Sequence, residues 1–260
     1  MSFKDKVVIV TGSSSGIGAA TAKLFAREGA KVTLVGRNVN KLKNIERECT
    51  ELGGVQPLTI VADVSKDEEA KAIVQKTVEH HGKLDVLVNN AGIGSFSSIL
   101  DTNYMTEFDR IITTNLRAVV VTTNAALPHL IQSKGNIINI SSISGVCPTP
   151  AMSHYCTSKA ALDHFSRSIA AEVASKGVRV NIVSPGPVKT DITHTMGISD
   201  EQVEIMGKST PLGFLIKSEE VGELVLYLAS SKAKSITGST FVIDVGSTLQ
   251  GITSSLEILK

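Results

Sequence analysis

The sequence predicts an α/β fold in which one doubly wound parallel sheet of seven strands is flanked by helices. Seven short apolar runs rich in β-branched residues recur along the chain, with helical patterns between them. Most runs are continuously apolar rather than alternating, which is typical of strands buried on both faces of a parallel sheet. Turn-forming and polar residues follow the runs, at the edge where open α/β sheets bind ligands.

The first half of the predicted sheet alternates strictly with helices. Each of the first three helices has apolar positions at helical spacing and a glycine at its end. Ser65 and Glu68 have the spacing of a capping box that begins the third helix. The expected strands are residues 6–10, 31–35, 57–62, 84–88, 136–140, 178–183 and 240–244, and these helices are residues 17–28, 40–52 and 66–81. Their apolar faces are Ile17, Thr21, Leu24 and Phe25 in the first helix, and Leu42, Ile45, Cys49 and Leu52 in the second.

Two longer helices are expected near residues 106–132 and 155–175. The second has an apolar stripe and a glycine stop, formed by Leu162, Phe165, Ile169, Val173 and Gly177. The chain contains no repeat, no low-complexity stretch and no Pro/Gly linker. Residues 1–260 are therefore expected to form a single domain.

Composition excludes several classes of protein. The 26 basic and 25 acidic residues are balanced, which gives no sign of nucleic-acid binding. No apolar run reaches the length of about 18 residues that a membrane-spanning helix needs. The first residues, MSFKDKVVIVTG, lack a signal-peptide layout, and the three cysteines lack CxxC spacing, so a cytoplasmic protein with reduced thiols is expected. The six histidines are not at metal-ligand spacing, so no metal site is expected.

The stretch TGSSSGIG, residues 11–18, follows the first strand and opens the first helix. Gly12 suits a tight turn, Gly16 lets backbone N–H groups approach a pyrophosphate, and Gly18 lets the helix pack close to the sheet. A simple tight turn would also explain glycines here. Their position between a strand and a helix favours dinucleotide binding.

The end of the second strand bears on which dinucleotide is bound. A site for NAD needs a carboxylate about 20 residues after the glycine loop, to accept from the ribose 2′-hydroxyl. The sequence there is VGRN, and no acidic residue occurs between Glu28 and Glu46. The planar guanidinium of Arg37 suits a 2′-phosphate instead. NADP (NADPH) is therefore expected and NAD is less favoured, unless Arg37 is simply a solvated surface residue.

Tyr155 and Lys159, in YCTSK, lie one turn apart on a predicted helix, and Ser142 follows the preceding strand. A phenol with a pKa near 10 needs about 4 kcal/mol to be lowered by about three units. One ammonium about 4 Å away supplies about 4 kcal/mol at an effective dielectric near 20. Lys159 alone is therefore sufficient to lower the pKa of Tyr155, and the positive ring of an oxidised nicotinamide would add to the effect. Tyr155 is then expected to act as general acid or base while Ser142 holds the substrate oxygen.

These motifs together resemble the short-chain dehydrogenase/reductase family over residues 4 to 248, with a Rossmann-type sheet. They are TGSSSGIG, Asp63-Val64, NNAG, Asn115, Ser142, YCTSK and SPGPVKT, in the family's order. The resemblance implies that Tyr155 is the acid/base, that Lys159 binds the nicotinamide ribose and lowers the Tyr155 pKa, and that Ser142 orients the substrate. It further implies that Asn115 holds a water in a proton relay to Lys159.

The resemblance also implies which residues bind the cofactor. Asp63, Val64 and Asn89 would line the adenosine pocket, Ala91 and Gly92 the ribose and phosphates, and Pro185, Gly186, Val188 and Thr190 the nicotinamide. Ser14 and Ile17 join Gly12, Gly16 and Gly18 in the glycine loop, and a basic residue at the position of Arg37 is a family mark of NADP use. The sequence departs from the family's pattern at Val245, where many members have glycine, and at Ser15, where some NADP-using members carry a base.

Residues 191–216 correspond to the family's mobile substrate loop. Met196, Met206, Leu212 and Phe214 are expected to form an adaptable apolar wall there, or else to pack beneath the loop. The tail, residues 249–260, runs past the last strand and is either loose or reaches a neighbouring subunit. The resemblance implies a homotetramer or homodimer, with contacts through the helices near residues 106–132 and 155–175.

The expected function is NADP(H)-dependent hydride transfer between nicotinamide and a lipophilic carbonyl or alcohol, such as a steroid, an isoprenoid or a xenobiotic ketone or aldehyde. A 3-oxoacyl-carrier or CoA reductase is an alternative. It ranks lower because an acidic carrier needs a basic rim, and HLIQSKGN before the catalytic strand carries only Lys134. A catalytically silent sensor or scaffold is disfavoured, because Asn115, Ser142, Tyr155 and Lys159 are all present.

Overall fold

The structure is a computed structural model that describes residues 2–249. Its core is one seven-stranded parallel sheet with the order β3-β2-β1-β4-β5-β6-β7. The strands are β1 (Val7–Thr11), β2 (Lys31–Gly36), β3 (Leu58–Val61), β4 (Val86–Asn89), β5 (Asn136–Ile140), β6 (Arg179–Pro185) and β7 (Thr240–Ile243). The predicted strands and the doubly wound parallel sheet are confirmed.

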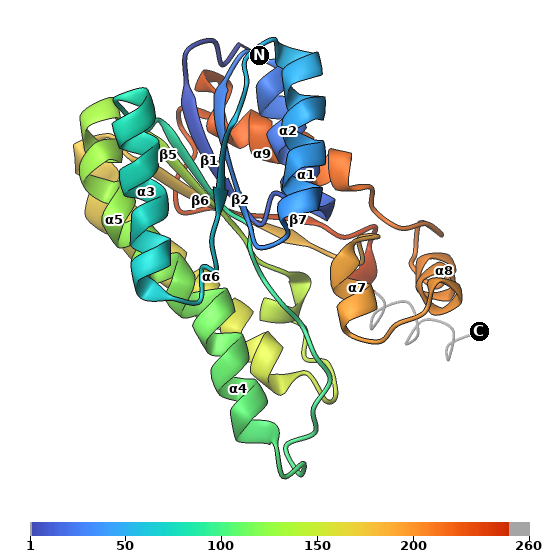
Figure 1. Ribbon diagram of the computed structural model, residues 1–260. Helices are drawn as coiled ribbons and strands as arrows, with labels where there is room; N and C mark the ends of the chain where they lie inside the picture. The colour runs from blue at the N-terminus through green and yellow to red at the C-terminus, as the bar shows by residue number, and fades with distance from the viewer. Residues whose placement is uncertain (1, 250–260) are drawn as a thin grey trace.

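Helices cover both faces of the sheet (Figure 1). One layer holds α1 (Gly16–Arg27), α2 (Val39–Gly53) and α9 (Ser218–Ala229). The other holds α3 (Asp67–His81), α5 (Ala118–Ser133) and α6 (Ser153–Val173), with α4 (Tyr104–Ile112) extending beyond the sheet. Two short helices, α7 (Asp191–Thr195) and α8 (Asp200–Lys208), follow β6.

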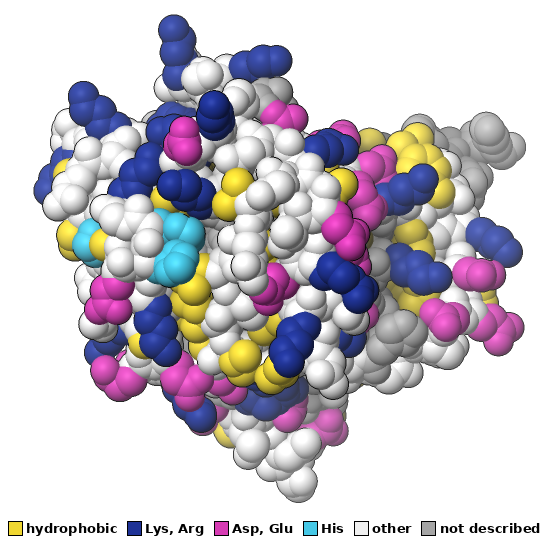
Figure 2. All heavy atoms as spheres, turned by 45° about the horizontal axis from the view of Figure 1, so that its top comes forward, with side chains coloured by type: hydrophobic (Ala, Val, Ile, Leu, Met, Phe, Trp, Pro, Cys, Tyr) yellow, Lys and Arg dark blue, Asp and Glu magenta, His cyan; other side chains and the backbone are white. Residues whose placement is uncertain are grey.

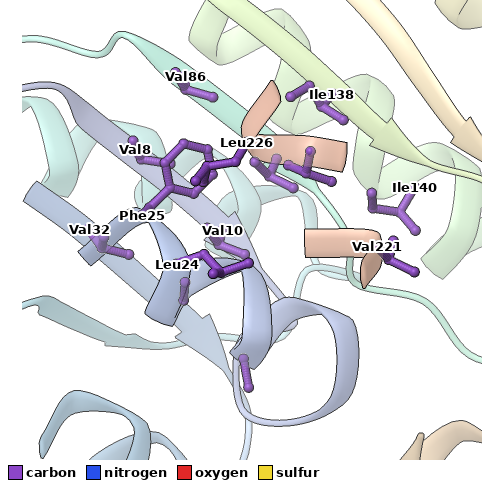
Figure 3. Packing of buried hydrophobic residues seen from close by; sticks show 14 of the residues in the cluster. Val8, Val10, Leu24, Phe25, Val32, Val86, Ile138, Ile140, Val221 and Leu226 are labelled. Atoms are coloured by element: carbon purple, nitrogen blue, oxygen red, sulfur yellow. The ribbon is translucent and has the colours of Figure 1, made fainter. Parts of the chain in front are cut away.

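Successive residues of β1 contribute to different cores, as the two-residue period of a strand requires. Val8 and Val10 pack with Leu24 and Phe25 of α1 in one core (Figure 3), while Val7 and Ile9 belong to the core on the opposite face. All five residues of β1 are buried. Continuous apolar runs are therefore the correct signature of this doubly covered sheet.

Two local expectations were wrong. The Ser65–Glu68 capping box does not form, because the Ser65 hydroxyl donates to Asp63 Oδ1 at 2.8 Å and α3 begins two residues later at Asp67. Leu52 is exposed near the end of α2, while Leu42, Ile45 and Cys49 are buried as expected. An amphipathic pattern at a helix end extends past the area that the sheet covers.

Surface charges of both signs are intermingled on the face drawn in Figure 2, in keeping with the near-equal totals of basic and acidic residues. No helix among the described residues is long and apolar enough to cross a membrane.

Asp85 joins the amino ends of the central strands. Its carboxylate is 5% exposed and accepts hydrogen bonds from the Val7 N–H at 2.9 Å and from Lys6 Nζ at 2.8 Å, while Lys83 Nζ lies 3.0 Å away. Burial opposes ionisation, but these donors outweigh it and hold the pKa of Asp85 below its ordinary value. A depressed folded-state pKa contributes stability that is present above the unfolded pKa and is lost as the pH falls through the folded pKa.

We expect Asp85→Asn to lower the free energy of unfolding at pH 7 by about 1–3 kcal/mol, because the buried Val7 N–H and the lysines lose a charged acceptor. Urea unfolding at pH 7 and below pH 4 measures the effect, with exposed Asp109→Asn on α4 as the matched control. The deficit should shrink at acid pH. A deficit that stays constant with pH would show that the Asp85 charge contributes nothing.

Candidate functional site

The glycine loop and the segment after β4 approach each other so closely that side chains are excluded. Gly12 has φ +66°, and a Cβ there would lie 2.8 Å from Ala91 Cα. A Cβ on Gly18 would lie 2.3 Å from the Gly12 oxygen. Both glycines are therefore needed for packing between backbones, and Gly18 lies behind the loop rather than in the cavity.

Thr11 and Asn90 fix this contact with four hydrogen bonds. The Thr11 hydroxyl accepts from the backbone N–H groups of Asn90 at 3.0 Å and Ala91 at 3.1 Å. The Asn90 amide donates to the carbonyls of Thr11 at 2.9 Å and Gly12 at 3.2 Å. The carboxyl ends of the neighbouring strands β1 and β4 are thereby locked together.

One cavity of about 650 Å³ lies along the carboxyl edge of the sheet. It brings together nearly all of the predicted site residues from loops far apart in sequence. Those that line it are Gly12, Ser14, Gly16, Ile17, Arg37, Asp63, Val64, Ala91, Gly92, Ser142, Tyr155, Lys159, Pro185, Gly186, Val188 and Thr190. Gly18, Asn89 and Asn115 do not line it.

Asn89 lies beneath the cavity, because the strand period directs it toward the layer of α5. Its amide donates to Thr123 Oγ1 at 3.2 Å and to Asn139 Oδ1 at 2.9 Å, and the Asn139 amide donates to Ser166 Oγ at 2.7 Å. This buried polar chain links α5, β4, β5 and α6. Asn90, which the sequence analysis passed over, is the asparagine that lines the cavity.

The first turn of α1 fits a dinucleotide diphosphate. No side chain caps this turn, and its N-cap, Ser15, lines the cavity together with Gly16 and Ile17. Uncapped N–H groups and the positive end of the helix dipole suit a phosphate group. A nicotinamide dinucleotide would therefore place its diphosphate against Gly12–Ile17.

Arg37 and Asp63 lie close together in the lining of the cavity, in the part that we call its adenosine end. Arg37 follows β2, is 69% exposed, and its Nη1 lies 3.9 Å from Asp63 Oδ2. Burial opposes ionisation of Asp63, but hydrogen bonds from Ser65 and the Arg37 charge outweigh it and lower the pKa of Asp63. Arg37 thus has the exposure and geometry to receive a further anion.

Lys159 is buried and lies over the face of Tyr155. Its Nζ donates to the Ile140 carbonyl at 3.0 Å and is 5.7 Å from the centroid of the Tyr155 ring. Burial lowers the pKa of Lys159 to about 8, although the Asp163 carboxylate favours the charged form. Lys159 is therefore mainly protonated at pH 7.

The expectation that Lys159 alone lowers the pKa of Tyr155 was wrong for this structure. Burial raises the pKa of Tyr155 to about 12, against a hydrogen bond with Ser142 that lowers it. The Lys159 ammonium is directed to the Ile140 carbonyl rather than to the phenol oxygen. Tyr155 is therefore a neutral phenol, able to donate a proton, at neutral pH.

Ser142 lines the cavity together with Tyr155 and Lys159, and we call this part of the cavity its catalytic end. Asn115 does not line the cavity but is bonded to Ile93, which does. Ser142 follows β5 and its Oγ accepts from the Ser144 N–H at 3.1 Å. Asn115 lies in a π-helical turn, Thr113–Arg117, a distortion that often marks functional sites. Its side chain bonds both backbone polar groups of Ile93 at 2.9 Å and donates to Ser158 Oγ at 3.2 Å. Asn115 thus holds the segment after β4 against α6.

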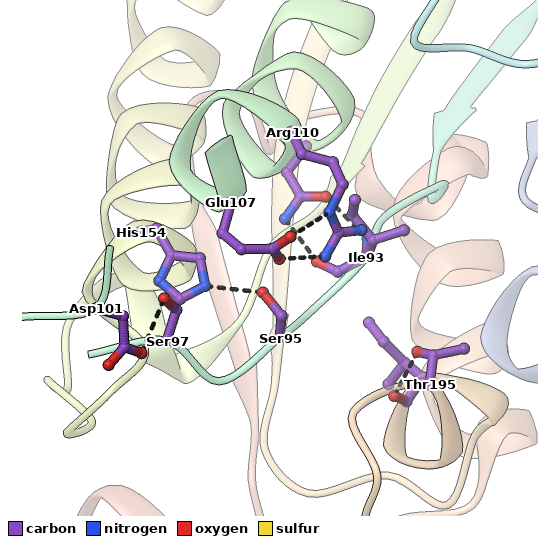
Figure 4. Close-up of polar contacts among 10 residues, drawn as sticks. Ile93, Ser95, Ser97, Asp101, Glu107, Arg110, His154 and Thr195 are labelled. Atoms are coloured by element: carbon purple, nitrogen blue, oxygen red, sulfur yellow. Dashed lines mark hydrogen bonds and ion pairs between the residues drawn. The ribbon is translucent and has the colours of Figure 1, made fainter. Parts of the chain in front are cut away.

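A further polar cluster borders the substrate end (Figure 4). His154, fully buried and adjacent to Tyr155, has its Nε2 3.0 Å from Ser95 Oγ, while Glu107 pairs with Arg110 at 2.6 Å. These residues connect α4, α6 and the segment after β4. No residue spacing in the sequence predicts the cluster, because its members come from three separate elements.

The predicted substrate loop, residues 191–216, contains α7 and α8. Met196 lies against the segment after β4, since a Cβ on Gly94 would be 2.8 Å from its Sδ. Met206, Leu212 and Phe214 are exposed and are absent from the cavity lining, so they neither pack beneath the loop nor form the expected wall in this structure. Of the predicted tail, residues 250–260 lie outside the described part of the chain.

No group of three potential metal ligands is found among the described residues. Cys49, Cys147 and Cys156 are free thiols.

Comparisons with known proteins agree with this geometry. The family model described as Enoyl-(Acyl carrier protein) reductase matches residues 12–248. The chain is 37% identical over 243 residues to the 3-oxoacyl-[acyl-carrier-protein] reductase FabG of Chlamydia muridarum, covering 93% of this chain and 97% of that protein. It is 34% identical over 251 residues to the glucose 1-dehydrogenase of Gluconobacter oxydans, covering 96% of this chain and 94% of that protein.

A solved structure matches equally well along the chain. It is a short-chain dehydrogenase/reductase of unknown function from Caenorhabditis elegans, crystallised with cofactor. The TM-score is 0.89 at 37% identity, with 95% of this chain and 96% of that chain covered.

Burial makes protonation of Lys159 unfavourable in the folded protein, so the free energy of unfolding depends on pH. The pKa of Lys159 in the folded protein, about 8, lies below the ordinary 10.5. The loss of folding stability caused by burying the charged amine is therefore complete below pH 8 and disappears above pH 10.5. We expect the free energy of unfolding to rise by about 1–3 kcal/mol from pH 7 to pH 10, relative to Lys159→Met. Denaturant unfolding checks this, with exposed Lys134→Met as control. Parallel pH profiles of wild type and Lys159→Met would contradict it.

Proposed function

Because the chain belongs to the short-chain dehydrogenase/reductase family, an oxidoreductase family that acts on CH–OH groups, we propose that it is an NADP(H)-dependent carbonyl reductase. The observation that carries the proposal is the meeting of Ser142, Tyr155 and Lys159 in the same cavity as an uncapped helix start suited to diphosphate.

The residues divide the work of reduction between them. A bound nicotinamide supplies the hydride that the carbonyl carbon accepts. The Ser142 hydroxyl donates a hydrogen bond to the carbonyl oxygen and orients it. Tyr155 gives its proton to the same oxygen, so the product is an alcohol and the tyrosine becomes a phenolate. The Lys159 ammonium, 5.7 Å from the centre of the Tyr155 ring, favours that phenolate by its charge, although burial outweighs this effect in the free protein.

The neutral state of Tyr155 is the one that reduction requires of a proton donor. A pKa of about 12 keeps the phenol protonated and ready to act as an acid. Oxidation of an alcohol would start from the phenolate, which burial disfavours. A nearby positive charge would have to lower the pKa before Tyr155 could act as a base.

Arg37 supports NADP(H) over NAD(H). It lines the adenosine end of the cavity directly after β2, and its exposed guanidinium is suited to bidentate contact with a phosphate. Asp63, the nearest carboxylate, is itself paired with Arg37 and Ser65.

We propose a lipophilic carbonyl substrate, such as a steroid, an isoprenoid or a xenobiotic ketone or aldehyde. Ile93 and Ile192 line the cavity at its catalytic end, and Met196 lies beside Gly94 at the same end.

A 3-oxoacyl thioester on an acidic carrier is the second candidate. The reductase of Chlamydia muridarum carries that name. The objection from Lys134 fails, because Lys134 ends α5 and precedes β5, at the edge of the sheet opposite the cavity. Lys23, Lys189 and Lys217 instead line a second cavity of about 510 Å³ beside the glycine loop, together with Glu48 and Glu219, so its lining has an excess of one positive charge for such a partner.

Self-association as a homodimer or homotetramer stays a prediction. Exposed apolar side chains on a helix of the expected interface support it, such as Val120 of α5.

Oxidation of NADPH and NADH by the purified protein, measured side by side, tests the proposal. The carbonyl panel contains diketones, quinones, retinal, farnesal, oxo-steroids and acetoacetyl thioesters. Turnover with NADPH on an apolar class supports the first candidate, and turnover restricted to thioesters supports the second. Absence of turnover on every compound would return the protein to the sensor or scaffold hypothesis.

Tyr155→Phe removes the proton donor while keeping the ring. We expect kcat to fall by about 10²–10⁴-fold, whereas the Kd for NADPH stays within about twofold. Stopped-flow turnover and equilibrium cofactor titration measure the two quantities. Near-normal kcat would exclude Tyr155 as the acid.

Arg37→Asp replaces the proposed phosphate ligand with a carboxylate that repels phosphate and accepts from a ribose hydroxyl. We expect the ratio of kcat/KM for NADPH to that for NADH to fall by about 10- to 100-fold. Steady-state kinetics with both cofactors measures this ratio. An unchanged ratio would mean that the 2′-phosphate is recognised elsewhere.

A further inference from the structure

An ion pair joins two segments that line the cavity. Lys41, in the first turn of α2, donates through Nζ to the carboxylate of Asp191, the first residue of α7, which lies 150 residues later. Both side chains line the cavity and each is 49% exposed. The pair therefore connects the cofactor-binding part of the chain with the beginning of the substrate loop.

Neighbouring contacts fix the backbone positions of Lys41 and Asp191. The Lys41 N–H donates to the side chain of Asn38 at 3.0 Å, which places Lys41 one helical turn after Arg37. On the other side, a Cβ on Gly16 would lie 3.0 Å from Thr190 Cγ2, so the residue before Asp191 packs directly against the glycine loop. Lys41 therefore extends from the corner that holds Arg37 toward the start of α1.

Two basic groups in this corner are each held by a carboxylate. Arg37 lies 3.9 Å from Asp63, and Lys41 pairs with Asp191. Exposed ion pairs of this kind are weak, so exchange of a partner costs little free energy. A phosphate dianion offers more charge and more acceptor oxygens than a single carboxylate, and lysine binds phosphate well.

We propose that Lys41 is a second ligand of the adenosine 2′-phosphate beside Arg37, and that Asp191 competes with this phosphate for Lys41. The proposal rests on the NADP(H) preference proposed above. When the phosphate takes Lys41, Asp191 loses the contact that ties α7 to α2. The 2′-phosphate then loosens one attachment of the substrate loop, so cofactor choice and loop position are coupled.

The test uses adenosine fragments that differ in the 2′-phosphate and contain no nicotinamide. Isothermal titration of the full chain measures Kd for 2′,5′-ADP and for 5′-AMP at one fixed salt concentration. The variants are Lys41→Gln, Asp191→Asn and Lys41→Arg. Lys43→Gln is the matched control, since Lys43 is exposed on the same helix and does not line the cavity.

We expect Lys41→Gln to raise the Kd for 2′,5′-ADP by about three- to tenfold and to change the Kd for 5′-AMP by no more than about twofold. Asp191→Asn should lower the Kd for 2′,5′-ADP by about two- to fivefold, because the substitution removes the competing carboxylate. Lys41→Arg should retain the preference, and Lys43→Gln should match the wild type.

The outcomes separate this proposal from the proposed function. If wild type binds 2′,5′-ADP no more tightly than 5′-AMP, the NADP(H) preference fails and the role of Lys41 fails with it. If wild type shows the preference but Lys41→Gln does not reduce it, only the role of Lys41 is overturned. Equal weakening of both ligands would assign Lys41 to the 5′-phosphate instead. An unchanged affinity in Asp191→Asn would overturn the competition.

Discussion

The contact between Thr11 and Asn90 is the constraint on which the site depends. It joins the carboxyl ends of β1 and β4, the adjacent strands at which the chain order of the sheet reverses. The approach is so close that Gly12 and Gly18 have no room for a Cβ. Because the loops are fixed there, the start of α1 faces the cavity. The segment after β4 is bonded to Asn115 through Ile93 and lines the same cavity as Tyr155.

Burial determines the chemistry at the catalytic end. It raises the pKa of Tyr155 to about 12 and lowers that of Lys159 to about 8, so the phenol is neutral and the amine only moderately basic. The Ile140 carbonyl, at the end of β5, holds the ammonium over the ring. One strand end thus orients Lys159 and leads into the turn that carries Ser142, so these residues, far apart in sequence, lie at one place in the cavity.

The two ends of the cavity use electrostatics in different ways. Lys159 is 5% exposed, so its interactions are strong and a change of charge there affects stability as well as chemistry. Arg37, Lys41 and Asp191 are exposed, so their pairs are weak and exchangeable. The proposed recognition of the cofactor's 2′-phosphate thus lies at the end with exposed, weak ion pairs, and the proposed proton transfer lies at the end with buried groups.

The sequence by itself determined the elements and the edge of the sheet where the site lies. Apolar periodicity is local, so the seven strands and the helices up to α6 follow from it directly, and the i, i+4 spacing places Tyr155 and Lys159 on one helix face. The helices α7, α8 and α9 were not among those predicted from the sequence. Tertiary structure alone decided where side chains point and which distant residues meet. The pleat of β4 turns Asn89 into the helix layer and leaves Asn90 at the cavity, and Lys134 falls at the far edge. The Ser95–His154 and Lys41–Asp191 contacts join separate elements, and only packing brings such residues within reach of each other.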